Sequence, residues 1–327
     1  MPLRNIKRTL LLALAALLPV VVSAGPAPAS YPDRMVKIVV PFAPGGGTDV
    51  VARTLAQEMA KDLGVSIIIE NKPGAGTIIG TQAVAASAAD GYTLLMGTFA
   101  NAVNPSLNPK LPYDPHRDFA PIALVARSFN IVVVNPNSPI QSIADLIAAA
   151  KADPEKLSYG TFGTGTSAHL AGELFKNMAG VNLTTVPYKG AAPAITDLVG
   201  GQIQVMFTTV ASAASLIAGG QLRALAVTSA ERSPAFPQLP TVAEAGVPGY
   251  AAESWCGLFA PAGTPADVID GLNKSAATAV QSEAFQKLGV NEGLVMVARP
   301  PEAFDQYVRG EEERWRKLIQ DAGIRVE

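Results

Sequence analysis

Residues 38–53 read Ile-Val-Val-Pro-Phe-Ala-Pro-Gly-Gly-Gly-Thr-Asp-Val-Val-Ala-Arg, and this stretch decides the fold. An apolar strand passes through a glycine-rich turn directly into an amphipathic helix. The unpaired backbone N–H groups and the positive end of the helix dipole then face one point in space, which suits an anion. The sequence therefore predicts an anion site at residues 42–49.

Nucleotide phosphates fit this turn poorly. A P-loop needs a lysine after its last glycine, whereas Thr48 follows Gly47 here. Gly45 and Gly47 match the first two glycines of a dinucleotide fingerprint, and Glu70 closes a second apolar strand at the spacing of a ribose ligand. Because Val50 stands at the position of the third glycine, dinucleotide binding is the less favoured alternative.

The N-terminus has the pattern of a secretory signal peptide. Three basic residues precede the apolar run 10–22, and Val22-Ser23-Ala24 is a small-residue cleavage signature. The run is shorter than the roughly 20 residues that a membrane-spanning helix needs. We expect cleavage of residues 1–24 and a soluble periplasmic protein. A cytoplasmic nucleotide cofactor does not suit an exported chain, so no cofactor is expected.

Composition narrows the function classes. Removal of residues 1–24 takes away three basic groups and changes the net charge from −2 to −5, so nucleic acid is not an expected partner. The single cysteine, Cys256, cannot form an internal disulfide, and with the distant His116 and His169 it gives no metal-ligand spacing. About 300 mature residues are enough for two lobes with packed cores.

Strand and helix patterns alternate along the chain, which predicts parallel strands covered by helices on both faces. The unit of strand, glycine- or threonine-rich loop and helix occurs twice, at 38–53 and 157–179. Two such lobes would form a cleft in which two helix N-termini hold a small ligand. Strands are expected at 36–40, 66–70, 93–97, 131–135, 157–161, 184–187, 205–207 and 224–227, and helices at 49–63, 78–86, 143–151, 167–179, 192–200, 265–282, 283–289 and 301–321.

Seven sequence blocks together resemble the signatures of the Bug family, the periplasmic solute receptors of tripartite tricarboxylate transporters. They occur in family order and cover essentially the whole mature chain. The blocks are Pro41–Asp49, Asn71–Gly76, Asp90–Leu95, His169–Glu173, Val186–Gly190, Pro240–Gly246 and Phe259–Pro265.

The resemblance implies an α/β, type II periplasmic-binding-protein fold with two lobes around a cleft. Lobe 1 would comprise residues 30–130 plus 230–327, and lobe 2 residues 131–229. Family members hold a carboxylate with backbone amides, hydroxyls and ordered waters. The ligand-binding residues carried over are Phe42, Ala43, Pro44, Gly45, Gly46, Gly47, Thr48, Thr98, Ala100, Asn101, Thr164, Gly165, Thr166, Ser167, Lys189 and Thr208.

Two departures from the family pattern bear on the ligand. Thr208 stands where many relatives carry an aspartate that could receive an amino group, so a plain carboxylic acid is favoured over an amino acid. Phe162 is bulkier than expected, which indicates a trimmed or more apolar pocket suited to an aromatic or short-chain acid.

Three further residues have alternative roles. Lys189 lies either beside the ligand or on the surface, and Trp255 either packs at the hinge or stacks on the ligand. For Asp49, a structural role at the helix start is favoured over ligand contact.

The sequence thus predicts a binding protein, not an enzyme, that captures a small carboxylate for the permease of a tripartite transporter. We expect a monomer without a metal. One alternative is a ligand-dependent sensor for a signalling partner. The other is an exported serine hydrolase, since residues 165–169 nearly match a nucleophile elbow. However, His169 faces away from Ser167 on the same helix, which leaves only His116 as a base.

Overall fold

The computed structural model describes residues 31–321 except 155 and 234, and the chain from Arg34 onward forms one compact unit. The predicted signal peptide, residues 1–24, lies outside the described residues. None of the helices in the described part of the chain is long and apolar enough to cross a membrane.

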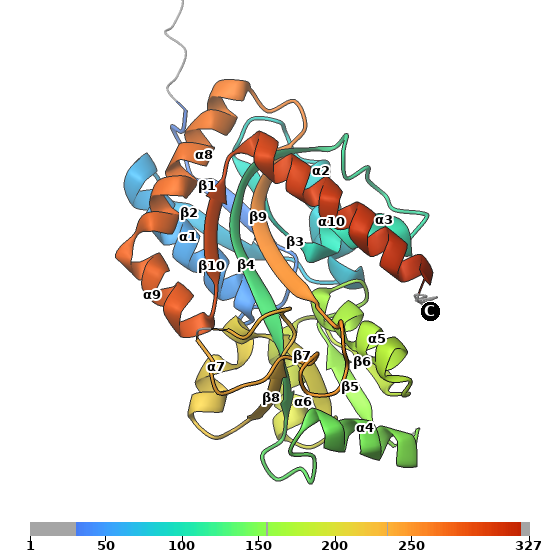
Figure 1. The fold of residues 1–327 in the computed structure, drawn as a ribbon. Helices are drawn as coiled ribbons and strands as arrows, with labels where there is room; N and C mark the ends of the chain where they lie inside the picture. Colours follow the sequence, from blue (N-terminus) through green and yellow to red (C-terminus); the bar gives the residue numbers. More distant parts are fainter. Residues whose placement is uncertain (1–30, 155, 234, 322–327) are drawn as a thin grey trace, which may run out of the picture. The chain divides into compact units, whose positions relative to one another are not determined.

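One mixed sheet of ten strands runs through the unit, in the order β2-β1-β3-β9-β4-β7-β5-β6, with β10 and β8 also paired to β4 (Figure 1). Half A of the sheet contains β1 (Val36–Val40), β2 (Ile67–Asn71), β3 (Thr93–Thr98), β9 (Glu253–Pro261) and β10 (Val295–Arg299). Half B contains β5 (Ser158–Thr161), β6 (Thr184–Pro187), β7 (Val205–Thr209) and β8 (Arg223–Val227).

Strand β4 (Phe119–Val134) belongs to both halves. Its residues up to Phe129 pair with β9, and those from Asn130 to Val134 pair with β7 and β8. Thr228 stabilises the place where β4 passes from half A to half B. Its hydroxyl lies within hydrogen-bond distance of the carbonyl oxygens of Asn130 (2.9 Å) and Ala252 (2.6 Å). Since Ala252 directly precedes β9, this buried hydroxyl ties together three chain segments where the two halves meet.

Helices cover the sheet as the alternating pattern predicts. Half A carries α1 (Gly47–Leu63), α2 (Ile78–Ala85), α3 (Phe99–Leu107), α8 (Ala266–Gln281), α9 (Glu283–Glu292) and α10 (Pro301–Asp321), and half B carries α4 (Ile143–Ala152), α5 (Ser167–Ala179), α6 (Ala191–Val199) and α7 (Val210–Ala218). In α1 the stripe Val51, Leu55 and Met59 is fully buried, because these apolar residues repeat at helical spacing.

The structure corrects several sequence-based predictions. Strands β1, β2 and β3 are parallel, as are β5, β6 and β7, but β9 is antiparallel to β3, and β4 is antiparallel to β7. The prediction missed α3, α7, β9, β10 and the first part of β4. Pro105 inside α3 hides that helix, since proline is unfavourable in helix interiors. The lobe boundaries near residues 130 and 230 stay a prediction.

Candidate ligand-binding site

The two halves of the sheet bring the carboxyl ends of their parallel strands to the same place. The loop after β1 meets the loop after β6, because the amide of Ala43 donates to the carbonyl oxygen of Lys189 at 3.0 Å. The amide of Gly47, the first residue of α1, donates to the Ser212 hydroxyl on α7 at 2.9 Å. These contacts join half A to half B, so the arrangement is closed.

A small cavity, here called the inner chamber, lies between these loops. Its volume is about 10 Å³, and it is lined by Phe42, Gly46, Gly47, Thr48, Phe162, Ala191, Thr209 and Ser212. A cavity needs about 10–15 Å³ to hold one water molecule. The inner chamber therefore has room for little more than one oxygen atom, such as that of a water or a carboxylate.

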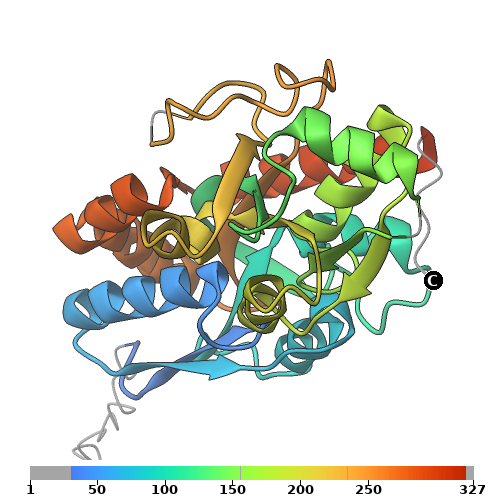
Figure 2. The same ribbon diagram turned by 90° about the horizontal axis from the view of Figure 1, so that it is seen from below.

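Three helices begin at the inner chamber. Gly46 caps α1, Thr209 caps α7, and Ala191 is the first residue of α6. Figure 2 shows α6 nearly end-on beside the N-terminal end of α1, and a methyl group placed on Gly46 would lie 3.5 Å from the Ala191 side chain. Each helix start carries roughly +0.5 elementary charge. Three positive helix ends facing one cavity favour an anion there.

Free hydrogen-bond donors accompany these helix ends. Among the residues that the structure describes, the amides of Gly46, Thr48 and Ala191 have no hydrogen-bond partner. The amide of Gly47 is satisfied by Ser212, whose hydroxyl also bonds to the Thr209 hydroxyl at 2.7 Å. The inner chamber thus offers unpaired backbone N–H groups from both halves, which is the chemistry that binds a carboxylate oxygen.

Asp49 does not compete for this position. Its buried carboxylate accepts hydrogen bonds from the amide of Gly45, from Arg53 Nε at 2.9 Å and from Asn71 Nδ2 at 2.8 Å. Burial by itself raises the pKa of Asp49, but these hydrogen bonds outweigh it and the pKa is lowered. Asp49 therefore stays ionised, and its hydrogen bonds stabilise the conformation of the 42–49 loop. This agrees with the structural role favoured for Asp49.

A larger cavity, here called the outer chamber, adjoins the inner one. Its volume is about 210 Å³, and Phe162 is a lining residue of both chambers. Its other lining residues come from the loops after β1, β2, β5 and β6: Pro41, Gly74, Ala75, Gly76, Thr77, Gly163, Thr164, Pro187, Tyr188 and Lys189. Phe162 was expected to trim the pocket; it borders both chambers, and the trimming stays a prediction.

The predicted loop at the start of α5 is mostly bonded to itself. The Thr166 hydroxyl donates to the carbonyl oxygen of Gly163 at 2.7 Å, and the amide of Gly165 donates to His169 Nδ1 at 3.2 Å. Ser167 is buried and donates to Asn130 Oδ1 at 3.4 Å. Of this loop's predicted ligand contacts, only Thr164 lines a chamber.

The remaining predicted positions lie outside both chambers. Thr98 and Asn101 form a reciprocal capping box at the start of α3, with Ala100 inside it. Thr208 is fully buried in β7, and its hydroxyl has no partner within the described residues. Ala43, Pro44 and Gly45 shape the turn without lining either cavity.

The nucleophile-elbow geometry is not present among Ser167 and the two histidines. His169 Nδ1 already accepts a hydrogen bond from Gly165, and the pKa of His169 is lowered by its burial. His116 lies elsewhere, with Nε2 2.7 Å from a carboxylate oxygen of Glu312 on α10. Neither histidine is placed to take a proton from Ser167.

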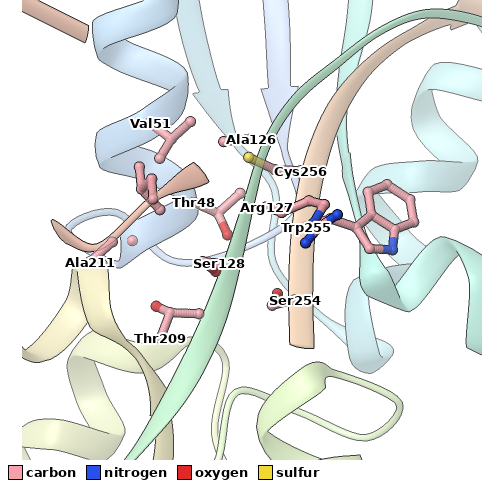
Figure 3. A pocket seen from close by; sticks show the side chains of 12 residues that line it. Thr48, Val51, Ala126, Arg127, Ser128, Thr209, Ala211, Ser254, Trp255 and Cys256 are labelled. Carbon is pink, nitrogen blue, oxygen red and sulfur yellow. The ribbon is translucent and has the colours of Figure 1, made fainter. Parts of the chain in front are cut away.

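Trp255 packs in the core of half A. Its ring meets those of Phe304 and Tyr307 edge-on, with centroids 5.7 and 6.1 Å apart. A third cavity of about 20 Å³ is lined by Thr48, Thr209 and Trp255 among others. In Figure 3 the Trp255 indole points to the other side of β9 from Thr48 and Thr209. This geometry fits packing near the hinge rather than stacking on a ligand. Neighbouring Cys256 is buried, which raises the pKa of its thiol to about 12.

Sequence reasoning missed Ala191, Thr209, Ser212 and the loop 74–77. The first three lie at helix starts that follow glycine or β7, a signal that the sequence does contain. Residues 74–77 carry the repeated glycines of the Asn71–Gly76 block, and all four have positive φ values of 133°, 47°, 58° and 82°. Positive φ values are uncommon for residues other than glycine and often occur at functional sites.

Comparisons with known proteins agree with this geometry. A family model described as a tripartite tricarboxylate transporter family receptor matches residues 51–324. The solved structure of the periplasmic binding protein BugD is 38% identical with a TM-score of 0.88, covering 91% of this chain and 100% of that chain.

Two further solved structures hold small acids. Rpa4515 of R. palustris with adipate is 38% identical with a TM-score of 0.87, covering 90% of this chain and 98% of that one. MatC (Rpa3494) from Rhodopseudomonas palustris with bound malate is 33% identical with a TM-score of 0.85, covering 88% and 100%.

These matches confirm the resemblance to the Bug family and the two-lobed periplasmic-binding-protein fold. The family and its structural neighbours are solute-binding proteins rather than enzymes. The chain belongs to the receptor family of the tripartite tricarboxylate transporters.

Proposed function

We propose that this protein is a periplasmic receptor that captures a small organic carboxylate and delivers it to the membrane permease of a tripartite transporter. The observation that carries the proposal is the inner chamber. Three helix N-termini and the unpaired amides of Gly46, Thr48 and Ala191 meet there, and none of the described residues that line it has an acidic side chain. Malate and adipate in the related structures support a carboxylate as the ligand.

Binding and closure are coupled in this proposal. The donors come from α1 in half A and from α6 and α7 in half B, so one anion contacts both halves at once. Without an anion, the positive helix ends repel one another. A carboxylate therefore favours the closed arrangement by binding it more tightly than the open one.

A permease is proposed as the partner from the family, and export to the periplasm follows from the signal-peptide pattern of residues 1–24. Catalysis is not part of the proposal. A sensor role remains the alternative, because capture of a ligand by closure would serve a signalling partner equally well.

A thermal-shift panel of mature protein tests the ligand class. Each of several mono-, di- and tricarboxylates is paired with its amide. A ligand at 100 times its dissociation constant stabilises the folded state by about 2.7 kcal/mol. We expect at least one acid to raise the melting temperature while its amide does not. Equal shifts by acids and amides, or shifts by amino acids alone, would contradict the proposal.

A further inference from the structure

We propose that Asn104 on α3 is a positioning residue. It holds residues 74–77 of half A against residues 163–165 of half B, and this contact, here called the 76–164 contact, slows release of the ligand. The inference rests on the proposed function and adds to it the group that sets the lifetime of the closed form. Asn104 lines neither chamber, so it acts through the two segments and not on the ligand itself.

The backbone of residues 74–77 adopts a conformation that its own residues do not favour. All four have positive φ values, and two of them, Ala75 (47°) and Thr77 (82°), are not glycine. In this region the Cβ atom of an L-residue comes too close to neighbouring backbone atoms. Such a conformation persists only where the surrounding structure holds it. Contacts from outside the segment are therefore needed.

Asn104 supplies such contacts. Its Nδ2 atom donates hydrogen bonds to the carbonyl oxygen of Gly76 at 3.2 Å and to the Thr77 hydroxyl at 3.3 Å. Asn104 and Thr77 are only 3% and 2% exposed, so water cannot readily replace these bonds if the amide is removed. One side-chain amide thus holds two consecutive residues of the segment.

Half B packs directly against the segment that Asn104 holds. A methyl group on Gly76 would overlap with the carbonyl oxygen of Thr164, and one on Gly163 would lie 3.4 Å from the Cα atom of Gly76. The oxygen of the Asn104 side chain faces the same loop, because a methyl group on Gly165 would overlap with Asn104 Oδ1. Asn104 therefore lies where half A meets the loop before α5.

The 76–164 contact is separate from the contact at the start of α1. The hydrogen bond between Gly47 and Ser212 lies at the inner chamber, which both residues line, whereas residues 74–77, Gly163 and Thr164 line the outer chamber. Because the 76–164 contact joins the two halves, it exists only while they are closed. It therefore opposes reopening and has little effect on the first encounter with a ligand, so its loss should act mainly on the dissociation rate.

Gly76→Ala tests this contact in the mature protein. Malate, succinate and adipate serve as probes, and stopped-flow mixing gives the association and dissociation rate constants. The new methyl group overlaps with the Thr164 carbonyl oxygen only when the halves are closed. We expect dissociation to become about tenfold faster or more, with association within about twofold of the wild type.

Gly64→Ala is the matched control. Gly64 also lies in half A and has a positive φ of 69°, but a methyl group there meets no atom within 4 Å. The substitution introduces similar backbone strain without a contact to half B. Both rate constants should therefore stay as in the wild type.

Asn104→Leu tests the positioning role from the other side of the contact. It removes the Nδ2 donor and keeps a side chain of similar size, so dissociation should become about threefold to tenfold faster. Asn273→Leu is its control, because Asn273 Nδ2 also donates to a backbone carbonyl oxygen, that of Ile122 at 2.8 Å, but from α8. Both changes should lower the melting temperature, whereas only Asn104→Leu should change the dissociation rate.

Wild-type dissociation rates in Gly76→Ala and Asn104→Leu would overturn this role of Asn104. A loss of affinity that comes only from slower association would overturn it as well. If Asn104→Leu does not fold, Gly76→Ala alone decides between these outcomes. Binding of any probe to the wild type would in each case leave the proposed function standing, whereas absence of binding by the three probes and by the wider panel would count against both.

Discussion

The loop before α1 and the loop before α5 look alike in sequence but are used differently in the structure. Both follow a parallel strand, contain glycines and threonines, and open a helix. The 42–49 loop reaches across to Lys189 and Ser212 of the other half and leaves amides unpaired. The 162–167 loop turns its hydroxyl and amide groups inward, onto Gly163 and His169.

The difference shows what makes a helix start available to a ligand. At α5, Thr166 and His169 satisfy the loop from within its own helix. At α1, the side chain nearest in sequence, Asp49, is held by Arg53 and Asn71 and reaches back only to Gly45. Local side chains therefore satisfy the polar groups of the α5 loop, whereas the α1 loop keeps unpaired amides that can bind an anion.

The largest effect is expected from Gly47→Ala. The new methyl group would lie 2.7 Å from Thr209 Oγ1 and 2.8 Å from the Ala211 side chain, both in half B. Overpacking of this kind typically costs about 1–3 kcal/mol. Calorimetry with a carboxylate identified by the panel should show roughly tenfold to hundredfold weaker binding, because only the closed form contains the clash.

Gly271→Ala on α8 is the control for this change. It is also a helical glycine, but a methyl group there meets no atom within 4 Å. Replacement of glycine by alanine inside a helix stabilises by up to about 1 kcal/mol, so binding should stay as in the wild type. Equal affinity losses in the two variants would argue that closure at Gly47 does not govern binding.

A smaller effect is expected from Ser212→Ala, which removes the acceptor for the Gly47 amide across the cleft. A hydrogen bond of this type contributes about 0.5–1.5 kcal/mol, and binding should weaken about threefold to tenfold with little change in unfolding free energy. The exposed Ser215, on the same helix α7, provides the control variant Ser215→Ala. An unchanged affinity in Ser212→Ala would mean that this bond does not stabilise the closed form.

The smallest expected effect is on the pH dependence of folding stability, through His169 at the start of α5. Burial lowers the pKa of His169 below 6.5, with Glu173 opposing and Lys176 adding to this shift. Below pH 6.5 the unfolded chain then binds more protons than the folded one, so stability falls as pH decreases, by at most about 1.4 kcal/mol per pH unit. Protonation of Nδ1 would also remove the acceptor for the Gly165 amide.

Chemical denaturation between pH 5 and pH 7.5 tests this dependence. His169→Gln carries no titratable ring, so its stability should fall less than that of the wild type as the pH drops below 6.5. Titrating groups remote from His169 contribute equally to both proteins and cancel in the difference, whereas Glu173 interacts with His169 directly. If the two curves stay parallel over this range, His169 does not couple the α5 loop to pH.

Much of the fold could be predicted because local patterns determine it. The alternation of strands and helices and the buried stripe of α1 follow from apolar spacing, and both are found. Strand direction in the middle of the sheet could not be read in this way. The antiparallel pairing of β4 with β9 joins segments more than a hundred residues apart, and no local pattern records it.

The same distinction applies to the site. The glycine-rich turn at 42–49 was found because its own residues carry the signal. Ser212 and Ala191, which complete the inner chamber, lie about 150 residues further along the chain and come into contact with it only through the fold. The assignment of ligand contacts to Thr166 and Ser167 stays a prediction that the internal bonding of the α5 loop does not favour.

Anion capture at the start of α1 is tested most directly by a crystal structure of the protein with a bound carboxylate identified by the thermal-shift panel. We expect one carboxylate oxygen within hydrogen-bond distance, about 2.7–3.2 Å, of the amides of Gly46, Thr48 or Ala191, with the Gly47–Ser212 bond intact. A carboxylate bound instead at the amides of Ser167 and Ala168, away from the start of α1, would contradict this assignment.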